Sequence, residues 1–159
     1  MGKKLLLILL VILSGCKGNT QETKKETAFK VNKTDAEWRS ELTEMEYQVL
    51  RKAATERAFS SDLLDNKQKG TYVCAGCGTP LFKSEHKFDS GTGWPSFDRE
   101  IKGNVAYSVD YKIGVPRSEE HCAVCGGHLG HVFNDGPRET TGKRHCINGA
   151  ALNFIPEGN

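Results

Sequence analysis

The sequence has 159 residues, among them 17 glycines, six cysteines and five histidines, and its formal net charge is +2 at pH 7. This length allows one domain with a buried core of its own. The nearly neutral charge excludes the strongly basic surface on which nucleic-acid binding depends, so we predict no nucleic-acid partner.

The first 15 residues have the pattern of a targeting signal. Lys3 and Lys4 precede an unbroken apolar run from Leu5 to Leu13, which is too short to span a bilayer. Residues 13–16 resemble a bacterial lipobox, and this resemblance implies cleavage before Cys16 and lipidation of that residue. The alternative is an ordinary secretory signal followed by a chance cysteine. We expect an exported protein that contacts a bacterial membrane, on its periplasmic or extracytoplasmic face, only through the N-terminal lipid.

A polar stretch follows and leads into the folded domain. We assign residues 16–36 to the lipidated cysteine and a flexible tether, and residues 37–156 to the domain. Thr43 and Glu46 form a capping box, which predicts a helix over about 44–57 with core-facing apolar residues. Residues 60–70 are predicted to be a loop.

After Gly70 the apolar residues alternate instead of following a helical period. Residues 105–113 predict a half-buried strand, and residues 71–73, 80–82, 123–133 and 146–154 predict further short strands. The many glycines agree with tight turns between antiparallel strands. The predicted fold is therefore mainly β, with a short N-terminal helical segment.

Four cysteines lie in two Cys-x-x-Cys-Gly knuckles, at residues 74–78 and 122–126. This spacing is typical of half a tetrahedral metal site, and the glycine lets backbone amides approach the sulfur atoms. Disulfides between the four cysteines are the alternative in an exported protein. We predict one structural zinc ion, with no open coordination position, bound by Cys74, Cys77, Cys122 and Cys125.

Cys146 lies outside the knuckles, after Arg144 and His145 and shortly before Asn148. A single thiol among cationic and hydrogen-bonding side chains is expected to have a low pKa and to act as a nucleophile. An inert buried thiol is the alternative. Trp94 lies on a loop between Gly93 and Pro95, where we expect the indole to form the wall of a small apolar pocket; the alternative is an anchor in the core.

Residues 91–97, 128–133 and 144–148, together with both knuckles, resemble the B-type methionine-R-sulfoxide reductases, and the resemblance covers residues 37–156. It implies two antiparallel sheets, a zinc site remote from catalysis, and reduction of the R epimer of methionine sulfoxide, either free or in oxidised proteins. It also implies a role for each matching residue. The catalytic group is Cys146 as nucleophile with His131, Asp135 and Arg144, and the substrate-binding group is Trp94, His128, Phe133 and Asn148.

The chemistry of sulfoxide reduction fits these roles. Attack by a thiolate on the sulfoxide sulfur needs a proton donor for the oxygen, and we assign that task to His131. The attack leaves Cys146 as a sulfenic acid. Many family members carry a resolving cysteine where this chain has Thr92, so we expect an external thioredoxin-like dithiol as reductant. His145 and Gly149 also depart from the family, which usually has an aromatic residue and a serine there.

Each of these roles has an alternative. His128 and His131 are three residues apart, which in a regular strand places them on opposite faces and makes one of them, for preference His128, structural. Asp135 also suits a turn, and Arg144 a surface ion pair. A partner-binding zinc ribbon or a rubredoxin-like iron protein would explain the knuckles, but neither would explain Cys146.

Overall fold

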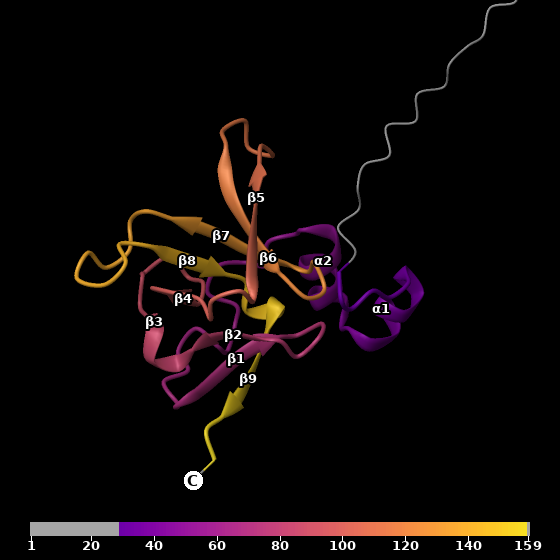
Figure 1. Cartoon of the computed structure of the whole chain (residues 1–159), viewed down its shortest axis with the longest axis horizontal. Coiled ribbons are helices and arrows are strands. Elements are labelled where there is room, and N and C mark those ends of the chain that lie inside the picture. The colour runs from indigo at the N-terminus through magenta and orange to yellow at the C-terminus, as the bar shows by residue number, and fades with distance from the viewer. Residues whose placement is uncertain (1–28, 159) are drawn as a thin grey trace, which may run out of the picture.

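The computed structural model describes residues 29–158, which form two short helices and two antiparallel sheets (Figure 1). The predicted mainly β fold with two antiparallel sheets is confirmed. The lipobox at Cys16 and the tether up to residue 28 lie outside the described residues. Among residues 29–158, no helix has both the length and the apolar character needed to cross a membrane.

The elements follow one another along the chain with short connections. Their order is α1 (Asp35–Glu41), α2 (Glu44–Lys52), β1 (Gly70–Cys74), β2 (Pro80–Lys83), η1 (Ser84–His86), β3 (Lys87–Phe88), β4 (Ser96–Phe97), β5 (Val105–Asp110), β6 (Arg117–Cys122), β7 (His128–Phe133), β8 (Arg144–Ile147), η2 (Gly149–Ala151) and β9 (Leu152–Pro156).

Both α-helices begin at a threonine capping box. Thr34 caps α1, a helix inside the segment that the sequence analysis divided between tether and domain, and Thr43 caps α2 as predicted. The tether segment also contacts the domain, since the Val31 N–H donates to the Val124 carbonyl at 3.0 Å. The helix predicted over about 44–57 begins as predicted, but its predicted end at residue 57 is wrong. α2 ends at Lys52, because Ala53 adopts the left-handed conformation with a φ of 51°.

The core lies where the two sheets face each other. One sheet has the order β2-β1-β9 and the other the order β3-β4-β8-β7-β6-β5. Phe97 of β4 stacks on Phe82 of β2, with ring centroids 4.4 Å apart, and meets the edge of Tyr72 of β1 at 5.0 Å. These fully buried rings join the sheets by apolar burial.

Three predicted strands differ from the observed ones. Residues 123–127 form a turn, so β7 begins only at His128, and the 3₁₀ helix η2 divides residues 146–154 between β8 and β9, which belong to different sheets. The strand predicted over 105–113 ends at Asp110, and its burial is not the predicted alternation. Tyr107 and Val109 are exposed while Asp110 is buried, because β5 is an edge strand that stands out from the body of the protein (Figure 1).

Candidate active site and cysteine cluster

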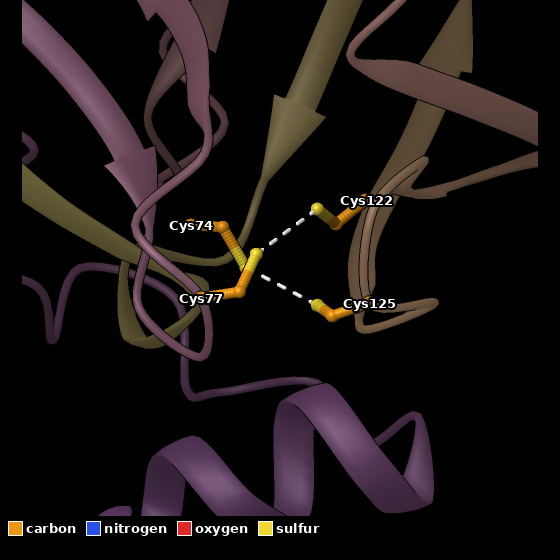
Figure 2. Close-up of side chains that lie close together, drawn as sticks. All are labelled: Cys74, Cys77, Cys122 and Cys125. Carbon is orange, nitrogen blue, oxygen red and sulfur yellow. Dashed lines mark hydrogen bonds between the residues drawn. The ribbon is translucent and has the colours of Figure 1, made fainter. Parts of the chain in front are cut away.

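The four knuckle cysteines meet in one cluster (Figure 2). Cys74 ends β1 and Cys77 lies in the turn that follows it, while Cys122 ends β6 and Cys125 lies in the next turn, so the cluster connects the two sheets. The two turns have the same geometry. In each, the glycine after the second cysteine has a φ of 70°, and its N–H donates to the carbonyl of the first cysteine at 2.8 Å.

The cluster has the dimensions of a tetrathiolate metal site. All four sulfur atoms lie within 4.8 Å of one another, and the four thiols are free. The closest pairs are Cys77 with Cys122 at 3.5 Å and Cys74 with Cys125 at 3.7 Å. Four sulfurs at about 2.3 Å from a central zinc ion would lie about 3.8 Å apart, so the residues fit a metal ion. The alternative, disulfides between these cysteines, is not observed.

A second group of functional side chains lies on one face of the six-stranded sheet. Cys146 of β8 lies directly opposite Ser96 of β4 on one side and His131 of β7 on the other, and His131 in turn lies opposite Glu119 of β6. Directly opposed residues of antiparallel strands point to the same face. A cavity of about 140 Å³ opens here, lined by Thr55, Trp94, Arg117, Gly130, His131, Phe133, Cys146 and Asn148.

His128 and His131 share this face despite their odd spacing. The register of β7 against β6 shifts between residues 120 and 121, so that Leu129 is an extra residue on β7. Such a bulge reverses the alternation of side chains. The two imidazole rings therefore meet edge to face, with centroids 5.6 Å apart. The prediction of opposite faces is wrong, and His128 lies against His131 without lining the cavity.

Each histidine has its own carboxylate, which the sequence analysis missed. Glu119 lies 2.7 Å from Nδ1 of His128, and Asp110 lies 2.9 Å from Nε2 of His131. The Lys112 backbone N–H donates to Asp110 at 2.7 Å, and this bond, with the contacts to His131 and Arg117, holds the pKa of the Asp110 carboxyl well below the usual range. Burial lowers the pKa of His128 and favours its neutral form, whereas the nearby Glu119 carboxylate acts in the opposite direction. The carboxylates fix the orientation of both rings.

Cys146 is half-buried, and its neighbours act on its thiol in opposite directions. Burial raises the pKa of this thiol above its ordinary value. The Arg144 guanidinium and the Thr92 hydroxyl, whose oxygen is 3.9 Å from the Cys146 sulfur, lower it by a smaller amount. The expectation of a low pKa is therefore wrong for the free protein, because it counted the cationic neighbours of the thiol but not the burial.

Arg144 lies beside the cavity without lining it. Its guanidinium lies 4.5 Å from the centroid of the Phe133 ring, and it donates two hydrogen bonds of 2.9 Å to Asp135. The side chain of Asp135 is 62% exposed and does not line the cavity, whereas that of Arg144 is only 11% exposed. Asp135 therefore reaches the site only by holding Arg144. The ion pair considered as an alternative exists, but its guanidinium is buried against Phe133 and only its carboxylate is on the surface.

Comparisons with known proteins identify the family of this chain. The SelR domain family matches residues 42–156. The chain belongs to this family. It is 53% identical over 130 residues to the peptide methionine sulfoxide reductase MsrB of Leptospira interrogans, which covers 81% of this chain and 98% of the relative. The proteins of the same name from Burkholderia lata and Leifsonia xyli are 52% and 49% identical over the same length, which covers 91% and 94% of those relatives. The resemblance to methionine-R-sulfoxide reductases is thus confirmed.

The outer wall of this SelR-family cavity comes from a segment predicted to be part helix. Residues 53–59, which we call the strap, form neither helix nor strand. Thr55 lines the cavity, and the Phe59 N–H donates to the Gly93 carbonyl at 2.8 Å. The Trp94 indole N–H donates to the Glu56 carbonyl at 3.3 Å. No short-range pattern in the sequence marks the strap, because its conformation depends on residues distant along the chain.

The structure shows the surroundings of the two positions beside the nucleophile, 145 and 149, that the sequence analysis singled out as unusual. His145 is fully buried on the face of β8 opposite to Cys146, and its Nδ1 lies 2.6 Å from Glu120, whose carboxyl pKa is raised by burial. A Cβ atom on Gly149 would lie 1.8 Å from the hydroxyl oxygen of Ser61. Ser61 therefore occupies the space that a serine at position 149 would need.

Proposed function

We propose that this methionine-R-sulfoxide reductase uses Cys146 as its nucleophile on the sulfoxide sulfur. The observation that supports this proposal is the position of the thiol, which lines a cavity of about 140 Å³ together with an indole, a phenyl ring and the imidazole of His131. A cavity of this size and lining suits a methyl sulfoxide group at the end of a flexible side chain. Trp94 and Phe133 supply the apolar walls for the methyl group.

In the first step the Cys146 sulfur attacks the sulfur of the sulfoxide while the sulfoxide oxygen receives a proton. His131 lies opposite Cys146 on β7 and is the proton donor, held by Asp110 through Nε2. The oxygen ends on Cys146 as a sulfenic acid, and the substrate leaves as the thioether. Burial raises the pKa of the thiol and so disfavours the thiolate. Arg144 and Thr92 act against this effect and stabilise the thiolate when it forms.

The second step restores the thiol with an external reductant. Among residues 29–158, Cys146 is the one cysteine outside the four-cysteine cluster, and Thr92 faces it where a resolving cysteine would be. We propose that a thioredoxin-like dithiol reduces the sulfenic acid, becoming a disulfide and releasing water. Mass spectrometry after one turnover without reductant should find sulfenic acid on Cys146. An intramolecular disulfide that includes Cys146 would overturn this step.

The four-cysteine cluster is proposed to hold zinc in a structural role. Its four thiolates complete a tetrahedral shell, so the ion supplies folding free energy and no open position for substrate. None of the four residues lines the cavity. Metal analysis of the purified protein distinguishes zinc, which is colourless here, from the red iron site of a rubredoxin-like protein.

The place of action is proposed from residues 1–16 alone. Lipidation of Cys16 would anchor the enzyme to a bacterial membrane, on its periplasmic or extracytoplasmic face, where it would repair oxidised exported proteins. Cell fractionation with a Cys16→Ala variant tests this location, because the variant should leave the membrane fraction. Retention of the variant in the membrane would contradict anchoring by lipid.

The reaction is tested with the separate R and S epimers of dabsylated methionine sulfoxide and dithiothreitol. We expect the R epimer alone to be consumed by the wild type, and neither epimer by Cys146→Ser. Consumption of S, or full activity of Cys146→Ser, would overturn the proposal. A partner-binding zinc ribbon would consume neither epimer in the wild type.

A further inference from the structure

The pocket residues Trp94 and Asn148 share one anchor, which is the backbone of Glu56 in the strap. The Glu56 carbonyl accepts the indole N–H of Trp94 at 3.3 Å, and the Glu56 N–H donates to the side-chain oxygen of Asn148 at 3.0 Å. The Asn148 side-chain amide in turn donates to the Leu129 carbonyl at 2.9 Å. The position of one backbone unit therefore determines where two walls of the cavity lie.

The carboxylate of Glu56 fixes that backbone unit. Its two oxygens accept hydrogen bonds from the backbone N–H groups of Gly149 at 2.6 Å and of Ala150 at 2.8 Å. These N–H groups begin η2, directly after the strand that carries Cys146. Glu56 is only 6% exposed, so these charge-assisted bonds form away from water, where they are strong.

The other hydrogen bonds of the strap backbone lie toward its two ends, where the Ala54 N–H donates to the Gln48 carbonyl at 3.0 Å and the Phe59 N–H to the Gly93 carbonyl at 2.8 Å. The strap has no sheet partner, and Glu56 itself does not line the cavity, so its carboxylate does not reach a bound sulfoxide. The bonds to η2 connect the strap to the chain segment of the nucleophile. Without them, the backbone of residue 56 would keep only its hydrogen bonds to Trp94 and Asn148, and a shift of this backbone would move both side chains.

We propose that Glu56 is a positioning residue, which sets the affinity for the sulfoxide by holding Trp94 and Asn148 in place. This inference rests on the proposed function for its kinetic part. It assigns the residues around the pocket to two tasks. Glu56 acts on substrate binding, whereas Arg144, Thr92 and His131 act on the chemical step. It also gives a structural role to a buried carboxylate beside the active site.

The test uses Glu56→Gln, which keeps the size of the side chain but turns one acceptor into an N–H₂ donor that opposes a backbone N–H. Loss of a hydrogen bond to a charged group predicts a rise in KM for N-acetyl-methionine-R-sulfoxide of about tenfold. The kcat should change less than about threefold, and the pH profile of Cys146 alkylation should not move. Acrylamide should quench the fluorescence of Trp94 more efficiently, as measured against Trp94→Phe.

Glu46→Gln is the matched control, because it removes another backbone-binding carboxylate, in the capping box of α2, that touches no cavity residue. Its KM and quenching should match the wild type.

If Glu56→Gln is recovered unfolded, Glu56→Asp carries the test, since the shorter acid should raise KM by a smaller factor. An unchanged KM and quenching, or an equal fall in kcat and thiol reactivity, would overturn the proposal. If the wild type reduces neither epimer, the proposed function fails, and the quenching measurement still decides whether Glu56 positions Trp94.

Discussion

The cysteine cluster and the cavity at Cys146 lie in the same small domain but are built in different ways. The cluster uses two turns of five residues with the same backbone geometry, each closed by a glycine with a φ of 70°. The cavity takes its lining from the strap, the loop of Trp94, and the strands β6, β7 and β8. Removing a part of the cluster should therefore weaken the whole fold, whereas removing a part of the cavity should leave the fold intact.

The largest expected contrast is between Cys77→Ser and Cys146→Ser. Cys77→Ser should release the metal and unfold the domain, because metal binding to a tetrathiolate site supplies free energy of folding. Cys146→Ser should lower kcat/KM by at least about 10³-fold, because no other group supplies the nucleophile. Circular dichroism, metal content and reductase activity measure both effects. A folded, metal-containing Cys77→Ser protein would contradict the structural role of the cluster.

The next effect concerns the proton donor and its carboxylate. His131→Ala should lower kcat by about 10²-fold, as expected for loss of a general acid. Asp110→Asn should lower kcat by about tenfold, because it removes the carboxylate that orients the His131 ring. Steady-state kinetics with the R epimer measures both variants. Should Asp110→Asn raise only KM, Asp110 would serve substrate binding and not the orientation of His131.

The pH dependence of alkylation tests the environment of the thiol. Only the thiolate reacts, and burial raises the pKa of Cys146, so iodoacetamide should react slowly at pH 7 and faster as the pH rises through that pKa. Arg144→Gln should move the midpoint to higher pH, because the guanidinium favours the thiolate. Rates are measured by mass spectrometry of the peptide containing Cys146. A midpoint below about 8.5, the ordinary value for cysteine, would contradict the effect of burial.

The smallest predicted effect concerns packing behind the cavity. Gly149→Ser should destabilise the protein by about 2 kcal/mol, because its Cβ would overlap Ser61. The double variant Gly149→Ser, Ser61→Gly should recover most of this loss, since the glycine frees the space. Urea unfolding of the two single variants and the double variant measures the coupling between the positions. Additive effects would show that residue 149 is limited by another neighbour.

Sequence patterns predicted the parts of this protein that are encoded locally. The knuckles, the threonine cap of α2 and the mainly β character each depend on residues a few positions apart, and the structure has all three. The predicted end of α2 and the faces of His128 and His131 were wrong. A left-handed residue at Ala53 and a bulge at Leu129 changed them, and neither has a regular signature in the sequence.

By itself, the sequence determined the family, the fold class and the list of reactive side chains, because these depend on the kinds of residues and their spacing. Only the tertiary structure decided which carboxylates hold the histidines, that burial outweighs Arg144 at Cys146, and that Glu56 connects the walls of the cavity. The physical reason is that burial and hydrogen bonding are set by contacts between distant segments. Glu56 and Gly149, for example, are 93 residues apart in the chain.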